Sequence, residues 1–216
     1  MFLLTVLDYA GIAVFAATGA LAASRKQLDL IGFLFFAAMT GLGGGTVRDL
    51  VLGLNPVFWV DDPTHILVCV LIGILLFFTA HRVESRYRLL IWLDAVGLAA
   101  YSVIGADKGL AATGSTTIAI IMGALTATFG GIMRDLIAHE PSVLLRPEIY
   151  ITAALAGACG FTAGQALGLP EYLSLALGVT VAFGLRGGAI HYGWTLPRYK
   201  PRPGRLPEDS LKNRDR

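Results

Sequence analysis

Apolar residues fill seven long stretches of the chain, and short polar segments separate them. A helix needs about 20 apolar residues to cross the hydrocarbon core of a bilayer. The stretches lie at about residues 1–23, 28–54, 64–80, 89–106, 113–138, 148–167 and 172–190. The pattern therefore predicts an all-α integral membrane protein with seven transmembrane helices.

Two of these stretches contain glycines followed by a charged pair. Residues 40–49 read TGLGGGTVRD, and residues 126–135 read TATFGGIMRD. Each glycine costs a helix interior about 1 kcal/mol relative to alanine, and a charged pair at membrane depth is costly unless it is paired or hydrated. We therefore predict that the second and fifth helices are broken there. The break would free carbonyl groups near Gly43 and N–H groups near Thr46, whose hydroxyl would cap the second half-helix.

The two glycine-rich segments belong to an internal repeat with an offset of 86 positions. The aligned pairs are Asp8 and Asp94, Gly44 and Gly130, Gly45 and Gly131, Arg48 and Arg134, and Asp49 and Asp135. After the loop shortens by two residues, Pro63 and Gly73 align with Pro147 and Gly157. Because each copy has three helices, an odd number, the second copy must enter the membrane inverted relative to the first.

The repeat divides the chain into four predicted parts. They are a first three-helix repeat at 1–80, a second, inverted repeat at 89–168, a seventh helix at 171–191 and a basic, disordered tail at 192–216. If the N-terminus lies outside the cell, every lysine and arginine except Arg48 and Lys108 lies on the cytoplasmic side or in the tail. This bias predicts an outside N-terminus and a cytoplasmic C-terminus.

Composition supports a membrane protein, because 55% of the residues are hydrophobic, 15% are charged and the mean hydropathy is +0.67. Soluble domains carry about a quarter charged residues. The four histidines have no ligand spacing, so we expect no metal site. A short polar loop between the fourth and fifth helices would hold Lys108 in solvent.

The charged groups and the glycines are the candidate functional residues. The pathway candidates are Gly43, Gly44, Gly45, Thr46, Arg48, Asp49, Phe129, Gly130, Gly131, Arg134 and Asp135, with Asp8 and Asp94 as supporting charges. Two interpretations stay open for the charges: structural ion pairs that close helix ends, or the lining of two mouths of a water-filled pathway. Phe129 aligns with Gly43 and would form a constriction.

An enzyme is disfavoured. The segment Gly44-Gly-Thr-Val-Arg-Asp49 resembles a stretch of tRNA nucleotidyltransferases, but those enzymes need a soluble domain with paired metal-binding acids nearby. Here apolar spans flank the segment, and it recurs in the second repeat. We therefore expect no catalytic residue and no nucleic-acid partner.

The doubled motif, the inverted three-helix units and the additional seventh helix resemble the prokaryotic branch of the trimeric intracellular cation (TRIC) channel family. The resemblance covers about residues 3–190. It implies a homotrimer in the bacterial inner membrane, with an hourglass pore in each subunit that passes monovalent cations, chiefly potassium. It implies no cofactor beyond bound K⁺ and lipid. The family's residues carry over to Gly43, Gly44, Gly45, Arg48, Asp49, Gly130, Gly131, Arg134 and Asp135.

Two alternatives remain. The basic-acidic lipid signature of animal members is not evident, although the basic tail would meet anionic lipid. Bacterial proteins with this tandem unit are also labelled glycine transporters, and broken helices suit alternating access as well as a pore. In that case Thr46 would begin a half-helix that holds a substrate carboxylate. A scaffold without transport is disfavoured, because it would not need two costly breaks.

Overall fold

The structure is a computed structural model that describes residues 2–83, 85–142 and 148–197. Within these ranges the regular structure is helical, apart from an isolated bridge between Glu148 and Thr195. The elements are α1 (Phe2–Arg25), α2 (Leu30–Leu52), α3 (Phe58–Asp61), α4 (Thr64–Thr79), the 3-10 helix η1 (Ala80–Arg82), α5 (Arg86–Thr113), α6 (Thr116–Ile137), α7 (Ile151–Ala166) and α8 (Glu171–Tyr192). Most of the predicted tail, from residue 198, lies outside the described residues.

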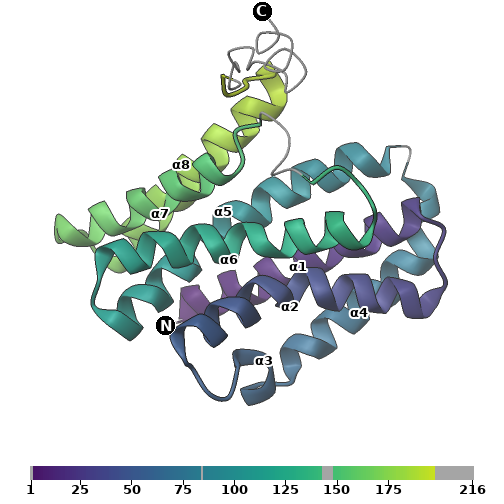
Figure 1. The fold of residues 1–216 in the computed structure, drawn as a ribbon, viewed down its shortest axis with the longest axis horizontal. Coiled ribbons are helices and arrows are strands. Elements are labelled where there is room, and N and C mark those ends of the chain that lie inside the picture. Colours follow the sequence, from purple (N-terminus) through teal and green to yellow (C-terminus); the bar gives the residue numbers. More distant parts are fainter. Residues whose placement is uncertain (1, 84, 143–147, 198–216) are drawn as a thin grey trace, which may run out of the picture.

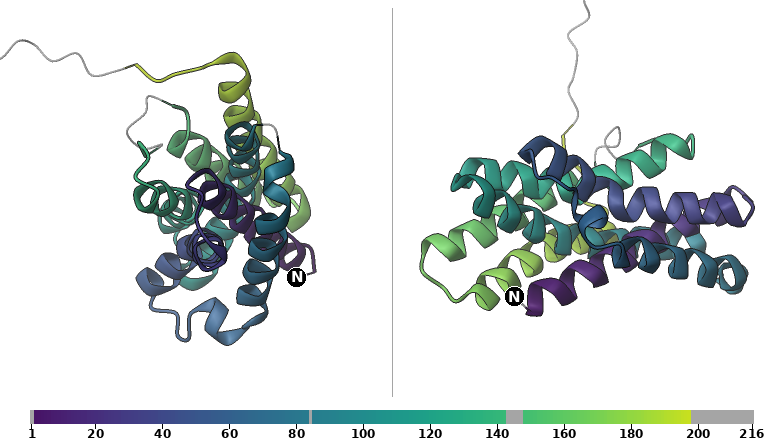
Figure 2. Two further views of the ribbon diagram at one scale, coloured as in Figure 1. Left: turned by 90° about the vertical axis from the view of Figure 1, so that its right-hand side faces the viewer. Right: turned by 90° about the horizontal axis from the view of Figure 1, so that it is seen from below.

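The long helices form one bundle around α1 and α5. Helix α1 packs against α2, α4 and α5, and α5 packs against α6, α7 and α8. Helix α2 of the first group contacts α6 of the second, and this contact joins the two groups (Figure 1). Helices α7 and α8 run side by side along one flank, and α4 lies on the opposite flank (Figure 1). In the right-hand view of Figure 2 most of the long helices run roughly along one direction.

Six helices in the described ranges are long and apolar enough to cross a bilayer: α1, α2, α4 with η1, α5, α6 and α8. Helix α7 has 16 residues. At a rise of 1.5 Å per residue it is about 24 Å long, shorter than a hydrocarbon core of roughly 30 Å. The predicted all-helical membrane architecture is therefore confirmed, with six helices of spanning length rather than seven.

The prediction of broken second and fifth helices is wrong. Helix α2 is continuous through Gly43, Gly44 and Gly45, and α6 is continuous through Gly130 and Gly131. The glycines instead allow two helix backbones to touch. A Cβ atom on Gly44 would lie 2.2 Å from the carbonyl oxygen of Thr126, and one on Gly130 would lie 2.4 Å from that of Thr40. Helices in membranes associate through such close backbone contacts, which offset the low helix propensity of glycine.

The predicted loop at 107–112 is also wrong, because α5 continues to Thr113. Polar Asp107 and Lys108 do not break a helix, whereas Gly114 has a φ of 65° and ends it in the left-handed conformation. The Ser115 side chain accepts a hydrogen bond from the N–H of Ile118 and begins α6. Lys108 is thereby a helical residue near one end of the bundle.

Contacts between distant segments define the two ends of the bundle. Asp8 near the start of α1 and Lys108 near the end of α5 lie 3.8 Å apart, and we call this side the Lys108 end. Arg25 at the end of α1 and Glu140 after α6 lie 2.8 Å apart, and this side is the Arg134 end.

Candidate functional site

The centre of the bundle is a pair of matching glycine contacts. Where Gly44 and Gly130 hold α2 against α6, Gly19 and Gly105 hold α1 against α2 and α5 against α6. A Cβ atom on Gly19 would lie 2.1 Å from the Phe36 carbonyl oxygen, and one on Gly105 would lie 2.6 Å from that of Met122. These contacts are related by the offset of 86 that the sequence contains. Equivalent residues therefore make equivalent packing contacts in the two halves.

The Arg134 end holds a fully paired guanidinium group. Arg134, which is 2% exposed, donates from Nη1 to Oδ1 of Asp94 at 2.8 Å. It also donates from Nε and Nη2 to Oδ1 of Asp135 at 3.0 and 2.9 Å. Charge-assisted hydrogen bonds of this kind offset part of the cost of burying the charges. The predicted meeting of these three residues is confirmed.

Further ion pairs surround this cluster and close the same end. Arg25 and Lys26 both contact Glu140, at 2.8 and 3.5 Å. Arg186 on α8 lies 2.9 Å from Glu148, with its guanidinium 5.0 Å from the centre of the Tyr150 ring. A small cavity of about 20 Å³ lies among these groups, lined by Asp94, Arg134, Asp135, Glu140, Glu148 and Arg186 with apolar neighbours.

The Lys108 end carries the equivalent residues in a different arrangement. Arg48, which is 1% exposed, donates from Nε to Oδ1 of Asp49 at 2.8 Å. Its Nη2 lies 2.7 Å from the same oxygen without hydrogen-bond alignment, and its Nη1 has no hydrogen-bond partner among the described residues. Oδ2 of Asp49 accepts from the backbone N–H of Phe58 at 2.9 Å. No ion pair joins Arg48 to Asp8, although both are described.

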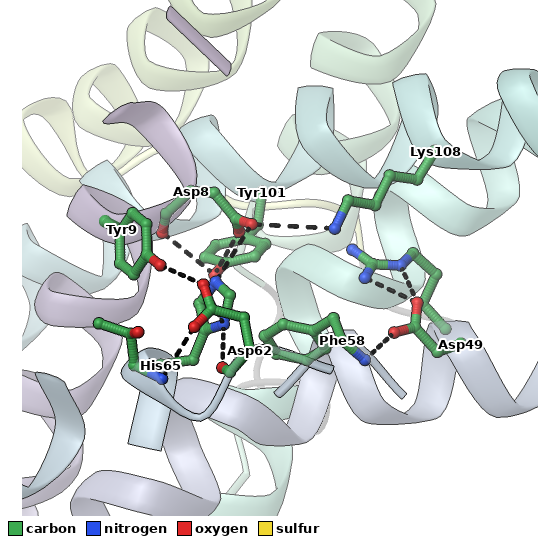
Figure 3. A network of polar contacts seen from close by, with 10 residues as sticks. Asp8, Tyr9, Asp49, Phe58, Asp62, His65, Tyr101 and Lys108 are labelled. Carbon is green, nitrogen blue, oxygen red and sulfur yellow. Dashed lines mark hydrogen bonds and ion pairs between the residues drawn. The ribbon is translucent and has the colours of Figure 1, made fainter. Parts of the chain in front are cut away.

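Asp8 instead faces a cavity of about 280 Å³ (Figure 3). The Tyr101 hydroxyl donates to Oδ1 of Asp8 at 3.1 Å. Oδ2 of Asp8 lies 3.8 Å from Nζ of Lys108 and 3.8 Å from Nε2 of His65. The cavity lining also includes Tyr9, Asp62 and Asp107. The cavity lining therefore combines three carboxyl groups with one ammonium group and one imidazole.

Phe58 of the short helix α3 lies beside Lys108, and Asp62, which follows α3, lines the cavity. Lys108 Nζ lies 5.5 Å from the centre of the Phe58 ring, and the Arg48 guanidinium lies 5.6 Å from it, so one ring faces two cations. Asp62 accepts hydrogen bonds from Thr64 and from the Tyr9 hydroxyl. These bonds, those from Thr64 first, lower the pKa of Asp62 to about 2.

Two predicted roles change with the continuous helices. The prediction that Thr46 caps a half-helix is wrong, because its hydroxyl donates to the Leu42 carbonyl at 2.7 Å and accepts from Nε1 of Trp59 at 2.9 Å. The prediction that Lys108 is merely solvated is also wrong. Phe129 is half-buried on α6, and its role as a constriction stays a prediction.

Sequence reasoning did not find His65 or Tyr101 as partners of Asp8. Tyr101 aligns with Phe15 at the offset of 86, so its hydroxyl has no counterpart in the other half. This difference between the two repeats is the feature of the sequence that could have identified Tyr101. His65 offered none, because its contacts come from α1, α3 and Asp62 and appear only in the folded bundle.

Comparison with known proteins agrees with this architecture. A family model described as "Glycine transporter" matches residues 5–82 and 91–166. The UPF0126 inner membrane protein YadS of Escherichia coli K12 is 39% identical over 198 residues, which cover 89% of this chain and 94% of the relative.

Two solved structures share the fold. The TRIC trimeric intracellular cation channel orthologue from Rhodobacter sphaeroides is 50% identical, with a TM-score of 0.88 over 90% of this chain and all of that one. A second structure, described under "Structural basis for conductance through TRIC cation channels", is 30% identical, with a TM-score of 0.83 over 93% of this chain and 98% of that one.

The matching glycine contacts and the two charge clusters are thus found in a chain that is similar over most of its length to solved TRIC channels. These relatives are ion channels and not enzymes. The protein belongs to the prokaryotic branch of the TRIC channel family, whose sequence model carries the glycine transporter label.

Proposed function

We propose that this protein is a channel for monovalent cations, chiefly potassium, with one pathway in each subunit of a homotrimer. Family membership supports the proposal, since the related solved proteins are named as trimeric cation channels. The pathway would run from the cavity at the Lys108 end, past the crossing of α2 and α6, to the cavity at the Arg134 end.

The observation that carries the proposal is the pair of carboxylate-lined cavities at opposite ends of the bundle. Asp8, Asp62 and Asp107 line one together with Lys108, and Asp94, Asp135, Glu140 and Glu148 line the other together with Arg134 and Arg186. Carboxyl groups at a pore mouth favour cations over anions. Between the cavities lie the backbone contacts at Gly44 and Gly130. This arrangement supports an hourglass pathway whose narrowest part is the helix crossing.

The proposed topology places the Lys108 end outside the cell and the Arg134 end in the cytoplasm. The distribution of basic residues supports this topology, because it places every lysine and arginine except Arg48 and Lys108 on the cytoplasmic side or in the tail. Helix α7 would then span as the sixth of seven helices, aided by its packing against α8. The relative YadS is named an inner membrane protein, which supports the same location here, and the basic segment after residue 198 would lie on anionic lipid.

The test is to record purified protein in planar bilayers under a KCl gradient. We expect discrete unitary currents that reverse near the potassium equilibrium potential. Mass measurement of the detergent-solubilised protein by light scattering should give three copies of the 22.9 kDa chain. A reversal potential near that of chloride, or a monomer in detergent, would contradict the proposal.

Saturable glycine uptake into liposomes without unitary currents would instead favour a transporter. The geometry gives that alternative less support than the sequence did. Helix α2 has no N-terminus at Thr46 that could hold a substrate carboxylate.

A further inference from the structure

His65 lies in the wall of the Lys108-end cavity, where an added proton would change the charge beside Asp8. Its ring is 7% exposed, stacks on Tyr9 with centroids 4.7 Å apart, and meets the edge of Phe58 at 5.1 Å. Aromatic rings on two sides hold the imidazole in one orientation (Figure 3). Its two nitrogen atoms therefore face defined partners.

The partners determine which nitrogen carries the proton in the neutral ring. Nδ1 lies 2.8 Å from the backbone carbonyl oxygen of Asp62. A carbonyl oxygen only accepts hydrogen bonds, so Nδ1 is the donor, and the lone pair of the neutral ring lies on Nε2. Nε2 faces Oδ2 of Asp8 at 3.8 Å. An additional proton binds at Nε2 and points at the Asp8 carboxylate.

We propose that His65 is a proton-binding residue that sets the cation preference of the Lys108-end cavity and the local concentration of cations in it. This inference rests on the proposed channel function. Protonation at Nε2 draws Asp8 towards the imidazolium and cancels one negative charge of the cavity. Fewer cations then gather at the mouth, and anions are excluded less strongly.

The charges around the ring support this effect. Besides His65, the charged and titratable groups that line the cavity are Asp8 and Tyr9 on α1, Asp62 before α4, and Asp107 and Lys108 on α5. Tyr101 on α5 is hydrogen-bonded to Asp8, and Arg48 and Asp49 on α2 are paired with each other beside the Phe58 ring. Arg48 and Asp49 offset each other, so three carboxyl groups outnumber the Lys108 ammonium at the cavity wall. Asp62, with its pKa of about 2, stays ionised over the whole range in which a histidine titrates.

The effect is confined to one end of the molecule. At the offset of 84 that applies after the shortened loop, His65 aligns with Ile149. The equivalent position at the Arg134 end therefore carries a side chain that binds no proton. The cavity at the Lys108 end should respond to pH on its own side of the membrane only.

The experiment measures bilayer currents while the pH on one side is lowered from 8 to 5.5, first on one side and then on the other. We expect cation current to fall roughly 2- to 10-fold, and the reversal potential under a KCl gradient to move towards zero, for acidification of a single side. His65→Gln should remove both effects, so that its current at pH 5.5 on that side equals its own current at pH 8. The matched control is His81→Gln, at the other end of the same span, which should behave as the unmodified protein.

Three results would overturn the inference while leaving the channel function intact: equal responses from both sides, no response at all, or an unchanged response in His65→Gln. A second measurement, which needs neither a current nor a variant, tests the inference even if His65→Gln folds poorly. Nitrogen NMR of labelled histidine in the unmodified protein should show a neutral ring protonated on Nδ1 that gains its second proton on Nε2. A neutral ring protonated on Nε2 would contradict the assignment, whereas absence of current at every pH would contradict the proposed function itself.

Discussion

Asp8 and Asp94 hold equivalent places in the two halves but have different partners. Asp94 accepts a 2.8 Å hydrogen bond from Arg134, whereas Asp8 contacts Tyr101, His65 and Lys108 and leaves Arg48 to Asp49. Asp94 is 2% exposed, and the Asp8 side chain is 16% exposed. Because burial strengthens a charge pair and raises the cost of breaking it, the same substitution should have unequal effects at these positions.

Asp94→Asn should lower the free energy of unfolding by about 3–5 kcal/mol, because it leaves part of the buried Arg134 charge uncompensated. Asp8→Asn is the matched control and should cost about 1 kcal/mol or less, since its ion contacts are long and reach solvent. Denaturant titration of each variant in detergent micelles measures the difference. Equal losses in the two variants would contradict the unequal pairing.

Phe129→Ala tests the constriction predicted from the alignment with Gly43. Removing a bulky ring beside the narrow part of the pathway should raise the unitary conductance, as recorded in planar bilayers. Ile121→Ala on the same helix is the control, because its side chain is 47% exposed on the bundle surface. Unchanged conductance in Phe129→Ala would show that the ring does not narrow the pathway.

At the scale of elements, glycine sets the distance between α2 and α6. Adjacent Gly43 and Gly44 differ in what a side chain would meet. A Cβ on Gly43 would lie 3.3 Å from Sδ of Met133, the flexible end of a side chain, whereas a Cβ on Gly44 would lie 2.2 Å from a backbone oxygen of Thr126. A methionine can turn away, but a helix backbone must move as a whole.

Gly44→Ala should therefore lower the unfolding free energy by about 1–3 kcal/mol or more through overpacking, and it should alter conduction by spreading the helix crossing. Gly43→Ala should be neutral or gain up to about 1 kcal/mol of helix propensity. Thermal unfolding in detergent and bilayer recordings compare the two. Similar destabilisation by both alanines would contradict the observed contact.

At the scale of the whole molecule, orientation depends on charge rather than on packing. Positive residues gather at the Arg134 end, where Arg25, Lys26, Arg86 and Arg186 lie near the helix ends. Lipid bilayers retain such residues on the cytoplasmic side. The charge bias therefore favours the proposed orientation, with the Arg134 end in the cytoplasm.

A reporter joined after residue 197 tests this orientation. Green fluorescent protein fused there should fluoresce, and alkaline phosphatase at the same place should be inactive, because the proposed topology places the C-terminus in the cytoplasm. The reciprocal fusions at the loop between α5 and α6, near Gly114, should give the opposite result. An active phosphatase after residue 197 would reverse the proposed topology.

The amino-acid sequence is enough to predict the helical membrane class, six of the spanning helices and the family. These properties follow from runs of apolar residues and from repeated motifs, which are local in the chain. It also placed Asp94, Arg134 and Asp135 together, because the start of one spanning helix and the end of the next lie on the same side of the membrane. The prediction of broken helices at the glycines is wrong. Helix propensity counts only the cost of glycine within one helix, whereas the close backbone contact between α2 and α6 stabilises two continuous helices.

The contacts that Gly44, Lys108 and His65 make appear only in the folded structure. The partner of Gly44 is Thr126, and the partners of His65 come from α1, from α3 and from Asp62 after it. Such contacts depend on the rotation and crossing of packed helices, which hydropathy along the chain does not encode. For the same reason the unequal pairing of Asp8 and Asp94 appears only in the folded bundle, where a single hydroxyl on Tyr101 and one imidazole draw Asp8 away from Arg48.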